Sequence, residues 1–167
     1  MILFTLGTAV YPFDRAINWL QELLRREIIV EPVILQHGVT SVASLSHPLV
    51  KSVVGLSRDE MHLAVKDASI VISHAGQGST RTLADMGVPF VLLPRLKRYR
   101  EHVDDHQLLF ARAVEKLGVR HCTELNQLMA SIIEPPPPFQ GKLFQASLLV
   151  DHLIAKYSRS QELSFHE

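Results

Sequence analysis

Residues 73–79 read SHAGQGS and bring two glycines together with imidazole, amide and hydroxyl side chains. They follow a short apolar run and precede a segment expected to be helical over residues 79–86. Small residues at the start of a helix let backbone N–H groups and the positive end of the helix dipole approach a phosphate, and Ser79 and Thr80 add hydroxyl donors. A tight strand-to-helix turn that requires glycine explains the same spacing equally well, so both interpretations stay open.

Residues 101–107 read EHVDDHQ and form a second polar group. His102 and His106 are four positions apart, which on one helix face is compatible with zinc. No third ligand is evident and the glutamate of HExxH is absent, so no metal site is expected. We favour a polar cluster at a helix N-terminus, in which His106 and Gln107 donate to sugar hydroxyls. A solvated first helical turn is the alternative.

Several common functions are excluded by composition and by missing motifs. The third glycine of GxGxxG is absent, and neither GK[ST] nor GxSxG occurs. The 167 residues carry 17 basic and 17 acidic side chains, which argues against nucleic acid as a partner. The single cysteine, Cys122, rules out an internal disulfide and a CxxC zinc motif.

The elements that must position these residues alternate along the chain. Short apolar runs predict strands, and segments with helical periodicity separate them. The pattern predicts an α/β, Rossmann-like three-layer domain with a mainly parallel sheet. Ligands of such sheets bind beyond the carboxyl ends of the strands, where Gly7 and Thr8 also lie. The expected strands are residues 2–6, 30–35, 50–54, 69–72, 90–93 and 119–122. The expected helices begin near Asp14, Ser57, Ser79, Val103 and Thr123. Asp14 and Thr123 are expected to be N-caps, and Ser57 and Glu60 to form a capping box.

The chain is expected to form a single domain over residues 1–134. A proline-rich spacer at residues 135–141 then leads to an amphipathic helix at 142–157, which either covers the same sheet or docks a partner, and to a flexible tail at 158–167. No run approaches the roughly 18 apolar residues that span a bilayer. The start of the chain lacks the basic region of a signal peptide, so a cytoplasmic location is expected.

The order and spacing of several segments resemble a known family. They are FTLGT at residues 4–8, PFD at 12–14, ISHAGQGS at 72–79, GVP at 87–89 and HVDDHQ at 102–107. Together they resemble the donor-binding, C-terminal half of GT-B glycosyltransferases of the family 28 type. The resemblance extends to small single-domain subunits of bacterial exopolysaccharide synthesis, which are related to the catalytic subunit of the eukaryotic dolichol-linked N-acetylglucosaminyltransferase.

The resemblance implies a nucleotide-diphosphate sugar as substrate, in particular a UDP-sugar such as UDP-N-acetylglucosamine or another UDP-hexose, and no cofactor or metal. Gly7 and Thr8 would lie near the diphosphate. His102 would also contact the donor, while relatives bind the ribose with a glutamate where this chain has Thr82. The residues implied to present donors at the helix start are Gly76, Gln77, Gly78 and Ser79, and those implied in catalysis are His74, His106 and Gln107.

The histidines at the two loops are also expected to act through charge. His74, His102 and His106 would titrate near neutral pH and stabilise the diphosphate or orient a sugar hydroxyl. The basic segment at residues 95–100 would concentrate positive charge beside them. The other six histidines have no such placement and are expected to be surface or packing residues.

The length of the chain and the resemblance together imply a hexosyltransferase that is active only with a partner. That partner would be a membrane-associated, acceptor-binding subunit that brings a lipid-linked acceptor and holds this chain peripherally at the inner face of the membrane. A non-catalytic nucleotide-sugar-binding or scaffolding subunit is the alternative. A zinc-dependent hydrolase, the third hypothesis, depends only on His102 and His106.

Overall fold

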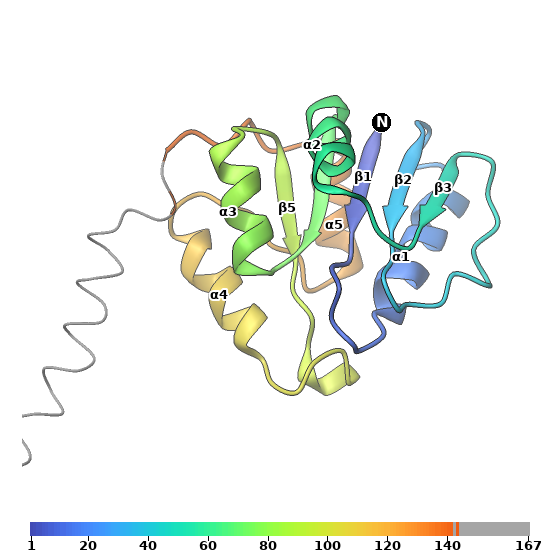
Figure 1. The fold of residues 1–167 in the computed structure, drawn as a ribbon, viewed down its shortest axis with the longest axis horizontal. Helices are drawn as coiled ribbons and strands as arrows, with labels where there is room; N and C mark the ends of the chain where they lie inside the picture. The colour runs from blue at the N-terminus through green and yellow to red at the C-terminus, as the bar shows by residue number, and fades with distance from the viewer. Residues whose placement is uncertain (142, 144–167) are drawn as a thin grey trace, which may run out of the picture.

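A computed structural model of the protein describes residues 1–141 and residue 143. Its five strands form one sheet in the order β3-β2-β1-β4-β5, and every neighbouring pair is parallel (Figure 1). The strands are β1 (Ile2–Thr5), β2 (Val33–Gln36), β3 (Val50–Val53), β4 (Ile70–His74) and β5 (Phe90–Leu93). The predicted helix at residues 142–157 and the predicted tail at 158–167 lie outside the described residues, apart from Leu143.

Helices cover both faces of the sheet, which confirms the predicted three-layer α/β architecture (Figure 1). One face packs against α1 (Asp14–Arg25) and α5 (Leu125–Ile133). The other face packs against α2 (Arg58–Asp67), α3 (Gln77–Asp85) and α4 (His106–Glu115). A short 3-10 helix, η1 (Lys97–Tyr99), lies between β5 and α4.

The central strand β1 shows why this sequence forms a buried parallel sheet. All four of its residues are buried, because both faces of the strand are covered. Phe4 packs into the α1 and α5 side of the core, whereas Leu3 packs into the α2, α3 and α4 side. Burying a side chain of this size stabilises the fold by about 1.5–3 kcal/mol. A continuous apolar run is therefore required here in place of alternation.

Several element boundaries differ from the sequence-based expectation. Residues 119–122 do not form a strand, because only one isolated bridge joins Leu92 to His121. The helix expected from Val103 begins at His106, since Asp105 is its N-cap. The helix expected from Ser79 begins two residues earlier, at Gln77.

Two predicted helix caps are also wrong. The N-cap of α1 is Phe13, so Asp14 is the first helical residue and not the cap. The N-cap of α5 is Glu124, which forms a capping box with Gln127, whereas Thr123 lies one position outside. The capping box of Ser57 and Glu60 at the start of α2 is confirmed. No helix among residues 1–141 is both long and apolar enough to cross a membrane.

Candidate functional site

Loops that follow neighbouring strands enclose a cavity of about 210 Å³ at the carboxyl edge of the sheet. A second cavity of about 270 Å³ adjoins it and shares Thr5, Met61 and Ser79 in its wall. Four predicted site residues line the first cavity, namely Gly7, Thr8, His74 and Ser79. The second cavity adds Gly78 and Thr82. The structure therefore brings the two glycine loops together, as parallel strands that share one edge require.

His74, the last residue of β4, is the packing centre of these loops. Its ring lies against Gly7 and Gly76, so closely that a Cβ on Gly7 would lie 2.6 Å from Cε1 of the imidazole. Its Nδ1 is 3.3 Å from the Thr5 carbonyl oxygen, which can only accept, so Nδ1 carries the proton and Nε2 is left as an acceptor. The glycine requirement at Gly7 and Gly76 thus follows from contact with one side chain.

Burial lowers the pKa of His74 to about 4. The hydrogen bond to Thr5 opposes this shift, and the charge of Arg95 adds to it. The imidazole is therefore neutral at pH 7, and the expectation that His74 titrates near neutral pH is wrong. It offers a hydrogen-bond acceptor and no positive charge to a ligand.

Gln36 at the end of β2 fixes the backbone of the Gly7 loop, and it was not among the site residues expected from the sequence. Its Oε1 accepts from the Thr5 hydroxyl at 2.8 Å and from the Gly7 N–H at 3.2 Å, while its Nε2 donates to the Gly7 carbonyl at 3.1 Å. A buried glutamine that ends an apolar strand is a signal that could have identified it. Gly55, Leu56 and Met61 also line the first cavity and were missed, because they follow a strand without a motif of their own.

The N-terminus of α3 is open toward the cavities. Its N-cap, Gly76, has no side chain to accept from the first-turn N–H groups. Those groups belong to Gln77, Gly78 and Ser79, and the first N–H groups of a helix have no partner within the helix. A Cβ on Gly78 would meet nothing within 4 Å, so packing does not explain this glycine. The arrangement can bind an anion through uncapped backbone donors and the helix dipole.

Gln107 lies at the other side of the carboxyl edge, in the first turn of α4, and lines neither cavity. Its side chain is buried, and its Oε1 accepts from the backbone N–H of Arg95 at 3.1 Å. Within the described part of the chain its Nε2 has no hydrogen-bond partner, so the amide is oriented with its N–H₂ group available to donate.

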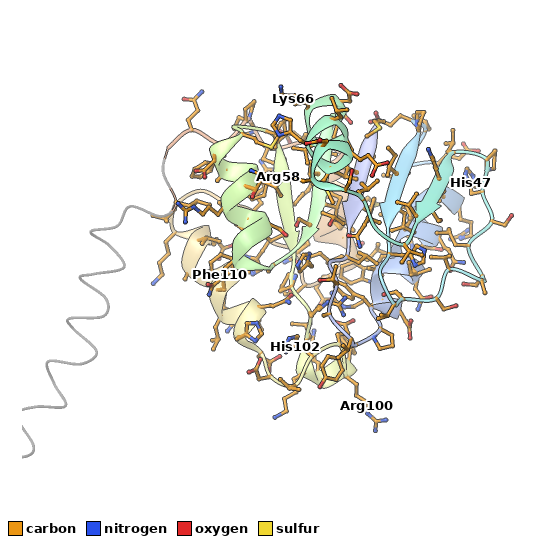
Figure 2. All side chains as sticks on the ribbon, viewed as in Figure 1. His47, Arg58, Lys66, Arg100, His102 and Phe110 are labelled. Atoms are coloured by element: carbon orange, nitrogen blue, oxygen red, sulfur yellow. The ribbon has the colours of Figure 1, made fainter. Side chains whose placement is uncertain are left out.

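Arg95 corrects the expectation of a basic surface loop. Its side chain is only 1% exposed and donates to the backbone carbonyl oxygens of Leu6 at 2.8 Å and Tyr11 at 2.6 Å. It also donates to the Glu101 carbonyl oxygen at 3.2 Å, and its guanidinium lies over the Phe13 ring. Arg95 therefore joins the loop after β1 to the loop after β5 instead of facing a ligand. Lys97, Arg98 and Arg100 are exposed, as the position of Arg100 in Figure 2 illustrates.

A buried ion pair holds the loop after β5 against α1. The Glu101 carboxylate accepts from Arg15 through two contacts of 2.9 and 2.8 Å, and both side chains are at least nine-tenths buried. The same carboxylate accepts from the Leu96 N–H at 2.8 Å. Arg15 also lies over the rings of Trp19 and Tyr99. The loop that leads to His102 and Gln107 is therefore fixed by the core.

His102 and His106 do not share a helix face, because α4 begins only at His106. The rings are nevertheless neighbours, with centroids 4.4 Å apart in an edge-to-face arrangement. Asp104 lies between them and approaches the Nδ1 atoms of both. Figure 2 shows His102 at the carboxyl edge of the sheet. Neither histidine lines the cavities that contain His74.

An all-parallel sheet with helices on both faces, and with glycine loops and an uncapped helix N-terminus at its carboxyl edge, is the arrangement of Rossmann-like α/β domains. The chain belongs to the glycosyltransferase family 28 C-terminal domain family, whose model matches residues 1–135. A UDP-N-acetylglucosamine–N-acetylmuramyl-(pentapeptide) pyrophosphoryl-undecaprenol N-acetylglucosamine transferase of Aquifex aeolicus (strain VF5) is 41% identical over 59 residues. The match covers 35% of this chain and 16% of that enzyme.

Solved structures show the same fold. The glycotransferase of kitacinnamycin superposes with a TM-score of 0.59 at 20% identity, covering 80% of this chain and 33% of that chain. The glycosyltransferase SnogD from Streptomyces nogalater superposes with a TM-score of 0.56 at 19% identity, covering 80% of this chain and 34% of that chain. The solution structure of ALG13 gives 0.56 at 20% identity, covering 84% of this chain and 89% of that chain. The chain thus spans about one third of the length of the first two proteins and most of the length of ALG13.

Proposed function

We propose that this chain is the donor-binding subunit of a glycosyltransferase that uses a nucleotide-diphosphate sugar. The donor would be a UDP-sugar such as UDP-N-acetylglucosamine or another UDP-hexose, and the acceptor would be lipid-linked. The family supports a transferase, and the name of the Aquifex relative supports a UDP-sugar donor and a lipid-linked acceptor. Bacterial exopolysaccharide synthesis, expected from the sequence resemblance, is the process we propose it serves.

The observation that carries this proposal is the uncapped N-terminus of α3 beside two joined cavities. The N–H groups of Gln77, Gly78 and Ser79 would bind the diphosphate, because uncapped donors and the helix dipole favour negative charge. Charge that develops on the leaving diphosphate would be stabilised by the same groups. Thr8 at the mouth of the first cavity would add a hydroxyl donor.

Gln107 would act on the donor sugar, and His106 would lie beside it. The hydrogen bond from the Arg95 N–H occupies Oε1 of Gln107, so Nε2 is left to donate, and a sugar hydroxyl would accept from it. His74 would contribute only an acceptor at Nε2, because its pKa is far below neutral pH. The catalytic group that deprotonates the acceptor would come from another protein.

We assign acceptor binding to a separate membrane-associated subunit. This assignment follows from the sequence resemblance to small single-domain subunits, and the described residues form one sheet with its helices. This chain would then act at the inner face of the membrane through its partner and would transfer little or no sugar alone.

Calorimetric titration with UDP-, GDP- and dTDP-sugars tests the proposal on the purified chain. We expect one UDP-sugar to bind saturably at one site, and Ser79→Ala to weaken that binding about tenfold through loss of a donor. Ser46→Ala, an exposed serine on a loop between β2 and β3, is the matched control and should bind normally. Binding of none of the nucleotide sugars would contradict the proposal.

Transfer distinguishes an active subunit from a scaffold. With the membrane fraction of the source cells as the supply of partner and acceptor, Gln107→Glu should reduce incorporation of labelled sugar at least tenfold. The substitution keeps an oxygen for the Arg95 N–H and removes the amide donors. Unchanged transfer by Gln107→Glu, with normal association with the membrane fraction, would instead support a scaffolding role.

A further inference from the structure

Three potential metal ligands converge in the turn that precedes α4. His102, Asp104 and His106 each present one donor atom, and these atoms all lie within 4.8 Å of one another. The Nδ1 of His102 is 3.4 Å from Asp104 Oδ1, and the Nδ1 of His106 is 2.5 Å from the same oxygen. Both imidazoles therefore direct the same nitrogen toward one carboxylate oxygen. No third ligand was expected from the sequence, because on a continuous helix Asp104 would not share a face with the two histidines.

Hydrogen bonding does not account for the His102 side of this cluster. Nδ1 of His102 is shielded from solvent and has no hydrogen-bond partner among the described residues. Its separation of 3.4 Å from Asp104 Oδ1 matches the edge of a tetrahedral zinc site, which is about 3.3–3.5 Å when the metal–ligand bonds are 2.0–2.2 Å long. A buried imidazole nitrogen without a partner, facing a carboxylate at ligand–ligand distance, is the arrangement that a metal ion completes.

We propose that His102, Asp104 and His106 bind one divalent transition metal ion, with zinc as the ion that best suits the donors. Two imidazole nitrogens and one carboxylate oxygen are typical ligands of Zn²⁺, and three protein ligands leave a fourth position open to solvent. Mg²⁺ and Ca²⁺ prefer oxygen ligands and would bind weakly here. This inference goes beyond the proposed function, since it requires neither nucleotide binding nor transfer.

The surroundings fix part of the site and leave the rest adjustable. The His102 side chain is only 18% exposed, and its ring packs 5.6 Å from that of Tyr11, so its position is set by the fold. His106 and Asp104 are 51% and 56% exposed, so they can separate by the roughly 1 Å that binding to a shared ion requires.

The helix dipole of α4 opposes cation binding at this site, and two carboxylates compensate for it. The positive end of the α4 dipole disfavours a cation at this position. The carboxylates of Asp104 and Asp105 lie at the same end of the helix, and that of Asp105 is fixed by accepting from the Lys97 N–H at 2.8 Å. With the metal bound, Asp104 would be a ligand and Asp105 a neighbouring negative charge that offsets the dipole.

Metal titration of the full chain, first treated with EDTA and dialysed, tests the proposal. We expect calorimetry with ZnCl₂ to show one Zn²⁺ bound per chain. The Kd for Zn²⁺ should rise at least about tenfold in His102→Ala, His106→Ala and Asp104→Asn, because loss of even an outer-shell partner commonly lowers metal affinity 10–100-fold. Co²⁺ in the same site should give the visible absorption of a tetrahedral ion, and the variants should lose it. His62→Ala, an exposed histidine on α2, should leave both signals unchanged.

Two outcomes would overturn the proposal. One is the absence of Zn²⁺ binding by the wild-type chain, and the other is equal binding by a triple variant of the three ligands, which would place the ion on other histidines. Circular dichroism and thermal unfolding show whether each variant folds, and Asp104→Asn keeps the shape of the side chain. A chain that binds Zn²⁺ but no nucleotide sugar would refute the proposed function alone.

Discussion

The imidazole of His74 lies so close to Gly7 that a Cβ at Gly7 would be 2.6 Å from its Cε1. Gly7 follows β1 and has a positive φ of 74°, whereas His74 ends β4. The neighbouring strands thus end in a contact that admits no side chain on the glycine. The first loop of the candidate site takes its shape from a histidine that the sequence suggested was catalytic.

The two glycines of the second loop should respond in opposite ways to alanine. A Cβ on Gly76 would collide with the His74 ring, so we expect Gly76→Ala to reduce the free energy of unfolding by about 1–3 kcal/mol. Gly78 has open space and a helical position, so Gly78→Ala should raise stability by up to about 1 kcal/mol. Urea unfolding of both variants measures the difference.

Ligand binding supplies the control for this pair. If a diphosphate contacts the backbone at Gly78, the added methyl group of Gly78→Ala should weaken nucleotide-sugar binding although the variant is more stable. Equal affinity of Gly78→Ala and the wild type for the donor would place the diphosphate elsewhere.

The buried neutral imidazole of His74 should make stability depend on pH. Its pKa is about 4 in the folded chain and its ordinary value is 6.5, so the unfolded state binds more protons between these values. Above pH 6.5 the imidazole is neutral in both states and the free energy of unfolding is undiminished. As the pH falls toward 4, protonation of the unfolded state reduces the free energy of unfolding by up to about 3 kcal/mol. His74→Gln removes the titrating group, and unfolding experiments from pH 7.5 to 4.5 should give it a flatter profile. Parallel profiles would show that His74 is not the cause.

Arg95 should be required for the order of the loops around the site. Arg95→Met keeps a long side chain but leaves the Leu6 and Tyr11 carbonyl oxygens without their donor, so we expect a loss of about 2–5 kcal/mol in unfolding free energy. Amide hydrogen exchange should accelerate in the loop between β1 and α1. Arg98→Met changes an exposed arginine in the same segment and should have little effect on either measurement. Unchanged exchange in Arg95→Met would contradict the linking role.

Thr82 gives a gain-of-function prediction. Its exposed side chain lies in the wall of the second cavity, and its hydroxyl donates to the Gly78 carbonyl oxygen at 3.1 Å. Threonine offers no carboxylate to the ribose hydroxyl groups. A carboxylate accepts from two hydroxyl groups at once, so Thr82→Glu should increase affinity for a UDP-sugar about threefold to tenfold. Calorimetry measures the change in affinity. A 2′,3′-dideoxy nucleotide is the control, because without ribose hydroxyl groups its affinity should not increase. A gain that is equal for both nucleotides would exclude ribose recognition.

The sequence was sufficient to predict the sheet and the edge that carries the site. Apolar runs and helical periodicity are local signals, and the parallel topology then places Gly7 and Ser79 at one edge. The burial of Arg95 was not predictable in this way, because its partners lie more than 80 residues away in the chain. The approach of Asp104 to two histidines was missed because it depends on where α4 begins. Boundaries of elements and long-range polar contacts are decided by tertiary packing.

The edge strand β3 has a consequence for how copies of this chain behave in a crowded cell. It is only four residues long, and Lys51 and Ser52 in its middle are exposed. An unpaired strand edge is a template for pairing with another chain, and a short strand with a charged lysine resists that pairing. The charge on β3 therefore disfavours the addition of a strand from another chain along this edge of the sheet.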